Sequence, residues 1–420
     1  MSKMNRTFLF ITAFFFMAGE ACGQQFDDFF EDRTLRLDYV FAGNNREQHI
    51  YFGQAYSTPR WAGRRKRLTE MPLAGNGQVR LKDAATGKLL YVHTFSTLFQ
   101  EWQATEEATK VQKAFEASYN VPFPRQPVEV TVTLTDFHRQ VVGQLTHTIN
   151  PDDILIRPIG DNGIPWRYVW TPDSVPDLAS CIDLAIVAEG YTAAEADKFY
   201  KDCRRAVDAL FAHEPFTTLK SRFNVVAVAP ASLDGGSSVP HQHQWRRTPV
   251  GTHYDTFYSD RYLMTQDIHR LYDVLSGVPF EHIIVLVNTG IYGGGGIYNQ
   301  VLVTTADHPT FGQVLVHEFG HSYGGLGDEY FYDDAYESSY PADTEPWEPN
   351  LTTKVDFEHK WAELLPDPTG RVGHFEGGGY QSKGVWRPSQ NCRMKTNEAE
   401  HFCPVCDRAI RRITDFYTSR

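Results

Sequence analysis

Residues 316–330, VHEFGHSYGGLGDEY, are the most informative stretch of this 420-residue chain. They begin inside an apolar-faced segment, residues 311–323, that predicts a helix. Residues four apart lie above one another on one face of a helix, so the imidazoles of His317 and His321 can reach a single point. Two imidazoles placed in this way are typical of a zinc site. Glu318 follows the first histidine and can reach a water on the metal, which is the position that a general base requires.

The third ligand of such a site is expected just after the helix. Gly324 allows the chain to turn back toward the histidines. In zinc peptidases with the pattern HExxHxxGxxH, that turn delivers a third histidine, but Gly327 stands at its position here. Asp328 is the next residue, and a carboxylate oxygen is an accepted zinc ligand. Asp328 is therefore the predicted third ligand, with Glu329 and the more distant His374 as alternatives.

Around this segment, strands and helices alternate from residue 179 to the C-terminus. Nearly continuous apolar runs are typical of strands that are buried on both faces. The expected elements are strands at 181–188, 223–229, 282–288 and 298–305, helices at 192–212, 262–275 and 311–323, and a glycine-rich turn at 290–296. Strands joined by helices predict an α/β domain over residues 179–420. We expect the strand at residues 298–305 to form the sheet edge beside the cleft, where an extended peptide could pair with it.

The N-terminal part has a different pattern. Residues 35–158 contain runs of alternating polar and apolar residues, rich in β-branched and aromatic side chains. They predict an all-β sandwich domain over residues 24–160, interrupted by one helix at residues 104–117. Residues 161–178 are rich in Gly, Pro and Asp and are interpreted as a linker.

The first residues of the sequence predict an export signal. Residues 1–23 combine a short basic start, the apolar run at residues 7–18 and small residues before a cleavage site after Gly23. The apolar run is too short to span a membrane as a mature helix. No other apolar run in the sequence has the length that a membrane helix needs. We therefore expect a periplasmic, cell-surface or secreted protein. A lipid anchor at Cys22 is the alternative, which Glu20 disfavours.

Composition excludes several function classes. The chain is 41% hydrophobic and 22% charged, values that are typical of a folded globular protein. Its net charge of −12 argues against a nucleic-acid partner. The five Arg and Lys residues in the segment 60–67 are interpreted as a solvated surface turn.

The cysteines near the C-terminus suggest a cross-link. An exported chain meets oxidising conditions, so Cys392 is expected to form a disulfide with Cys403 or Cys406. The alternative is a structural zinc ion held by these three cysteines and His401.

The segment 317–330 closely resembles the active-site segment of peptidase family M64, which is named for a bacterial immunoglobulin A peptidase. Residues 391–394, NCRM, and 402–406, FCPVC, extend the resemblance. It implies a β-rich N-terminal domain followed by an α/β metzincin-like zinc peptidase domain, which has a mixed sheet and an active-site helix. By the same resemblance, Met394 is the Met-turn residue that lies as a hydrophobic floor beneath the zinc histidines.

Together these features predict an exported zinc endopeptidase that contains one catalytic zinc ion. Its partner would be a protein or peptide substrate, with a host glycoprotein such as immunoglobulin as one candidate. Two alternatives stay open: an exported glycan- or protein-binding protein with a vestigial zinc domain, and a zinc amidase that acts on non-protein substrates.

Other residues near the motif are candidates for further roles. Tyr380 and His401 are candidates for a second oxyanion donor. Asp333 and Asp334 could bind Ca2+, although a solvated loop is the preferred interpretation. The histidine-rich loop at residues 231–260 is likewise interpreted as a loop near the cleft, with a second metal site as its alternative.

Overall fold

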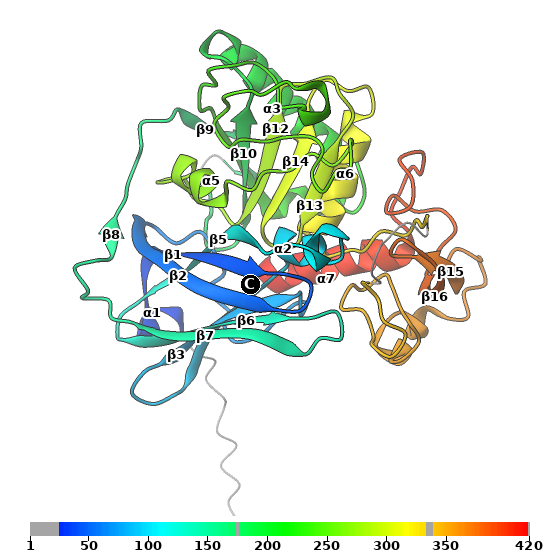
Figure 1. Ribbon diagram of the computed structural model, residues 1–420, viewed down its shortest axis with the longest axis horizontal. Helices are drawn as coiled ribbons and strands as arrows, with labels where there is room; N and C mark the ends of the chain where they lie inside the picture. The colour runs from blue at the N-terminus through cyan, green and yellow to red at the C-terminus, as the bar shows by residue number, and fades with distance from the viewer. Residues whose placement is uncertain (1–24, 174–175, 333–338, 419–420) are drawn as a thin grey trace, which may run out of the picture.

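The computed structural model describes residues 25–173, 176–332 and 339–418. The predicted signal peptide with Cys22, and the proposed calcium ligands Asp333 and Asp334, lie outside these residues. Figure 1 shows a β-rich N-terminal part below an α/β part, with the long C-terminal helix α7 (Pro404–Thr418) between them. Among the described residues, no helix has the length and apolar character needed to cross a membrane.

The N-terminal part is β-rich, as predicted, and contains two four-stranded sheets. The first has the order β5 (Lys113–Pro124), β1 (Phe30–Gly43), β2 (Gln48–Pro59) and β8 (Arg157–Pro158). The second has the order β4 (Leu89–Phe95), β3 (Gly77–Asp83), β6 (Val128–Thr135) and β7 (Val141–Ile149). Side chains from both sheets, among them Phe41 and Val130, are buried in one shared core. Strand β6 alternates buried and half-buried residues, which is the period of a strand with one face on a core.

The helix predicted at residues 104–117 is wrong. Helix α2 (Leu98–Gln103) ends before it, a short 3-10 turn at Glu107–Thr109 follows, and β5 begins at Lys113. Strand β5 pairs with β1 along its whole length. Pairing of that extent outweighs the weak local preference of a helix-forming sequence.

The second part is built on one six-stranded mixed sheet. Its order is β13 (Gly294–Ile297), β14 (Val301–Thr305), β12 (His282–Val287), β10 (Ile182–Glu189), β11 (Phe223–Val228) and β9 (Trp166–Trp170). The four central strands are parallel and the two edge strands are antiparallel. Helices α3 (Ala196–Phe211) and α6 (Phe311–Ser322) share a core with one face of this sheet, while the other face shares a core with the N-terminal part.

Two predictions about this sheet need correction. The segment 161–178, interpreted as a linker, contains β9, which pairs with β11 as an edge strand. The glycine-rich segment predicted as a turn at 290–296 contains most of β13, so β13 is the edge strand and β14 lies one position inside it. Glycine is usually depleted in strands, and it is found where another backbone approaches closely.

Shorter elements complete the chain. They are α1 (Phe26–Phe29), α4 (Phe216–Leu219), α5 (Ile268–Val274), the hairpin of β15 (Phe375–Gly378) and β16 (Gln381–Arg387), and short 3-10 turns at Ala193–Glu195, Lys220–Arg222, Pro240–Gln242, Phe357–His359 and Ala362–Leu364. The helix predicted at 262–275 is thus shorter, because residues before Ile268 are extended or turn-like.

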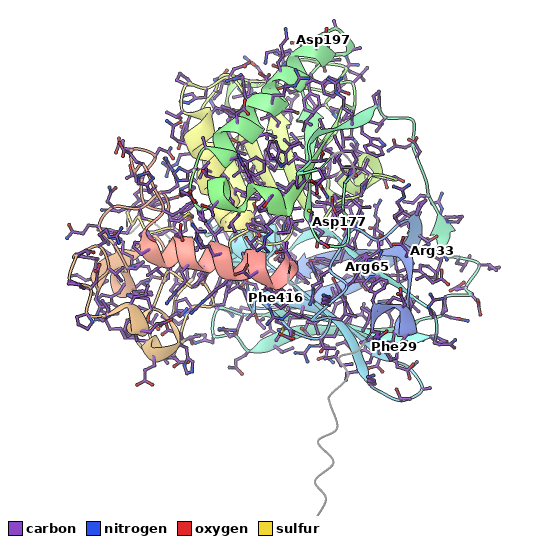
Figure 2. The ribbon with its side chains drawn as sticks, turned by 180° about the vertical axis from the view of Figure 1, so that it is seen from behind. Phe29, Arg33, Arg65, Asp177, Asp197 and Phe416 are labelled. Atoms are coloured by element: carbon purple, nitrogen blue, oxygen red, sulfur yellow. The ribbon has the colours of Figure 1, made fainter. Side chains whose placement is uncertain are left out.

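The basic segment 60–67 lies at the junction of the two parts. Arg64 is buried and donates hydrogen bonds to the backbone carbonyls of Arg67, Leu68 and Val92. The guanidinium groups of Arg64 and Arg67 lie 5.1 and 4.9 Å from the ring centre of Phe416 on α7. Figure 2 shows this end of α7, marked by Phe416, against the N-terminal part. The segment is therefore a partly buried contact between the two parts, and the prediction of a solvated surface turn is wrong for Arg64.

Candidate metal centre

Helix α6 carries the two predicted histidine ligands. It is held by its buried apolar side chains, which include Val314, Leu315 and Phe319. It also packs directly on the edge strand, because β13 consists mostly of glycine. A Cβ atom at Gly296 would lie 2.5 Å from the carbonyl oxygen of Glu318, a distance that real Cβ atoms do not reach. The glycines therefore allow the helix and the edge strand to lie side by side.

Three donor atoms converge at the C-terminal end of α6. The Nε2 atoms of His317 and His321 are 3.1 Å apart. The Oδ1 atom of Asp328 lies 3.1 Å from the first and 3.2 Å from the second. Ligands of a tetrahedral zinc ion, bound at about 2.0–2.1 Å, are about 3.3 Å apart. The three atoms thus match one face of a zinc tetrahedron.

The other ring nitrogens fix how both imidazoles present their lone pairs. Nδ1 of His317 lies 2.9 Å from the carbonyl oxygen of Arg393, and Nδ1 of His321 lies 2.6 Å from that of Leu326. A carbonyl accepts, so each Nδ1 carries the proton, and in a neutral ring Nε2 then presents a lone pair. Two such lone pairs and a carboxylate oxygen face one another. A cation between them, either a proton or a metal ion, removes this repulsion, so the donor set fits a zinc ion.

Asp328 is the charged member of the set. It is buried, which by itself raises its pKa, but the two imidazoles more than offset this and hold the pKa well below its usual range. Burial lowers the pKa of His321, whereas the charge of Asp328 raises it to about 10 in the metal-free protein. The hydroxyl of Tyr380 donates to the other carboxylate oxygen, Oδ2, at 2.5 Å and orients the group.

Comparison with known proteins identifies the family. A family model described as IgA Peptidase M64 matches residues 172–370 and 366–414, and one described as Peptidase M64 N-terminus matches residues 25–146. The chain belongs to peptidase family M64. No curated protein matched it. The family assignment predicted from the motif is confirmed, and it supports a peptidase.

In this M64 protein, Glu318 lies beside the donor triangle and is not part of it. A Cβ atom at Gly294 would lie 3.1 Å from Glu318 Oε1, so the carboxylate lies against the edge strand. Burial raises the pKa of Glu318, and the neighbouring imidazoles act in the opposite direction. A carboxylate in this position can exchange a proton with a water molecule bound at the neighbouring donor triangle.

The donor triangle opens into a cleft of about 1180 Å³, which is lined by residues of both parts of the molecule. The N-terminal part contributes Glu101 and neighbouring residues of α2, which Figure 1 shows next to β13. Burial in the cleft raises the pKa of Glu101 to about 7, although the hydroxyl of Tyr262 donates to it and lowers that pKa. No sequence signal indicated Glu101, because its place in the cleft depends on contact with residues about 160 positions away.

Among the alternatives for the third ligand, Glu329 and His374 lie elsewhere. The structure places Glu329 in a separate group of donors. The ring of His374 meets that of Phe357 edge to face, with the ring centres 4.4 Å apart. Tyr380 contacts Asp328, and His401 is exposed. Met394 is buried beside α6, where a Cβ atom at Gly320 would lie 2.6 Å from its sulfur atom.

The disulfide predicted among the C-terminal cysteines is not formed. Cys392, Cys403 and Cys406 are free thiols. The sulfur atoms of Cys392 and Cys406 are 3.7 Å apart, whereas a disulfide bond is about 2.05 Å long. Within the part of the chain that the structure describes, the groups of donors close enough to hold a metal ion are this cluster with Glu329 and the His317–His321–Asp328 triangle. The histidine-rich loop at residues 231–260 contributes to neither group.

Proposed function

We propose that this M64 protein is an exported zinc-dependent endopeptidase. The observation that carries the proposal is the triangle of His317 Nε2, His321 Nε2 and Asp328 Oδ1, with Glu318 beside it. Membership of a peptidase family supports hydrolysis of peptide bonds. Export is inferred from the signal-like residues 1–23.

A zinc ion held by these three side chains would polarise a water molecule and a scissile carbonyl group. Glu318 accepts the proton of the attacking water and then delivers it to the leaving amine. Its raised pKa suits both steps, because the group must be deprotonated before attack and protonated after it. The hydrogen bonds from the two Nδ1 atoms keep both imidazoles in the tautomer that binds metal.

Strand β13 is the element that would bind an extended peptide. The N–H of Gly294 donates to the carbonyl of Arg261, and its carbonyl accepts from the N–H of Leu263, both at 3.4 Å. These groups point away from β14. Backbone groups two residues apart in an antiparallel strand point the same way, so those of Gly296 face outward along the same edge. Gly296 lines the cleft, and a substrate strand can pair with it there by backbone hydrogen bonds.

Metal removal tests the proposal. Chelation should abolish hydrolysis of a mixed peptide library, and stoichiometric zinc should restore it. Asp328→Ala should lose both the activity and one zinc ion per chain. Glu106→Gln is the matched control, because Glu106 lines the same cleft and pairs with Lys110 outside the triangle.

Full peptide hydrolysis by the chelated protein would contradict zinc dependence. Zinc-dependent hydrolysis of non-peptide amides, without cleavage of any library member, would instead identify a zinc amidase. A zinc-loaded protein that cleaves neither class would favour the binding-protein alternative.

A further inference from the structure

We propose that Glu329, Cys392, Cys403 and Cys406 bind a second zinc ion, which is structural and separate from the catalytic centre. One donor atom from each of these four buried side chains lies within 4.8 Å of the other three. Three thiolates and one carboxylate form a complete tetrahedral ligand set, with no position left for water or substrate.

The spacing of the donors fits zinc. In a tetrahedral site with Zn–S distances of about 2.3 Å, two sulfur atoms are about 3.8 Å apart, and a sulfur and a carboxylate oxygen are about 3.5 Å apart. Here the sulfur atoms of Cys392 and Cys406 are 3.7 Å apart. Glu329 Oε1 lies 3.2 Å from the sulfur of Cys406 and 3.9 Å from that of Cys403.

Glu329 provides an independent indication that a cation belongs here. Its side chain is fully buried, with 0% of its surface exposed. Oε1 accepts a hydrogen bond from the amide of Asn350 at 3.1 Å, but Oε2 has no hydrogen-bond partner among the described residues. A fully buried carboxylate with one oxygen left without a partner is costly to hold as an anion, and a cation bound at Oε1 compensates that charge.

Local contacts offset part of the cost of holding negatively charged sulfur in this buried cluster. Cys403 immediately precedes α7 and Cys406 lies in its first turn, where the helix dipole stabilises a thiolate. The backbone N–H of Cys403 donates to the sulfur of Cys392 at 3.3 Å. Four basic side chains act electrostatically on the cluster: Arg387 and Lys395 on Glu329, Arg393 on Cys392, and Arg408 on Cys403. They offset the negative charge that three thiolates and a carboxylate leave on a divalent ion.

This second zinc site would hold the catalytic centre in place through two chain segments, one at Glu329 and one at Cys392. Glu329 follows the catalytic ligand Asp328, and its N–H donates to the carbonyl of Met394 at 2.8 Å. Cys392 precedes Arg393, whose carbonyl holds the ring of His317. Residues 388–403 contain no helix or strand, so a metal ion that joins Glu329, Cys392 and the start of α7 would replace the order that secondary structure provides elsewhere.

Zinc analysis and X-ray absorption of the purified full chain test the proposal. The wild type should hold two zinc ions per chain and show a sulfur shell at about 2.3 Å. The double variant His317→Ala/His321→Ala should retain one zinc ion, with three sulfur neighbours. Loss of all zinc in a folded double variant, or a wild-type zinc spectrum without a sulfur shell, would overturn the proposal.

Cysteine variants and a thiol count complete the test. Cys406→Ser should lose the sulfur-bound zinc, whereas Cys181→Ser, outside the cluster, should keep it. If Cys406→Ser does not fold, the wild-type spectrum still decides. A titration of the unfolded wild type that finds two thiols fewer than the sequence contains, together with no sulfur-bound zinc, would identify a disulfide and refute the metal site.

Discussion

Substitution of Tyr380 by Phe removes a single hydroxyl group, the one that donates to Asp328 Oδ2. A hydrogen bond to a charged group contributes about 1.5–3 kcal/mol. Loss of a group that orients a metal ligand typically weakens metal binding about 10–100-fold, which corresponds to about 1.4–2.7 kcal/mol. The two estimates agree. We therefore expect the catalytic zinc of Tyr380→Phe to bind about 10–100-fold more weakly, because Asp328 loses the hydrogen bond that orients it.

The assay is peptide hydrolysis at free zinc concentrations set by a chelator buffer. The half-saturating zinc concentration should rise in Tyr380→Phe, and saturating zinc should restore most of the rate. The control is Tyr332→Phe, since the hydroxyl of Tyr332 accepts from Arg261 and does not contact Asp328. An unchanged half-saturating zinc concentration, with a rate that zinc does not restore, would refute this reasoning and assign the hydroxyl to the substrate instead.

Two further predictions concern stability. Gly320→Ala places a methyl group 2.6 Å from the sulfur of Met394. We therefore expect a loss of about 1–3 kcal/mol in the free energy of unfolding, measured with urea, and a lower rate of hydrolysis. A variant as stable as the wild type would show that Met394 does not support α6. Asp183 is buried with only one oxygen bonded, to Asn224, and burial raises its pKa to about 8. A raised pKa in the folded state contributes stability that is present below about pH 4 and is lost as the pH rises toward 8. The stability gain from Asp183→Asn should therefore grow by about 1.4 kcal/mol per pH unit between pH 5 and 7; a gain that does not vary with pH would contradict this.

The sequence predicted the part of the site that depends on local geometry. The spacing of His317 and His321 is fixed by the helix itself, and Asp328 lies within a short turn of it. Tyr380 could not be assigned to Asp328, because the contact joins segments 52 residues apart. The fourth residue of the cysteine cluster could not be predicted for the same reason. His401 is near Cys403 in sequence but is exposed, whereas Glu329 contacts Cys406 from 77 residues away.

The fold was predicted where burial dominates and missed where tertiary contacts override local preference. The apolar runs that became β10, β11 and β12 are buried at every position. The glycines of β13 suggested a turn, because a glycine run has no strand signal of its own. Their role appears only when α6 is seen to pack against them. Likewise, β5 forms where the local sequence favours a helix, because β1 offers it a full-length partner.

The most direct test of the central claim is peptide hydrolysis by wild type and Glu318→Gln, with the zinc content of each measured in the same samples. Glutamine keeps the shape of the side chain but accepts no proton, and loss of a general base typically costs about 10²–10⁴-fold in rate. We predict that Glu318→Gln holds as much zinc as the wild type and hydrolyses peptides at least 100-fold more slowly, in line with that typical cost. Hydrolysis by zinc-loaded Glu318→Gln at the wild-type rate would contradict the account.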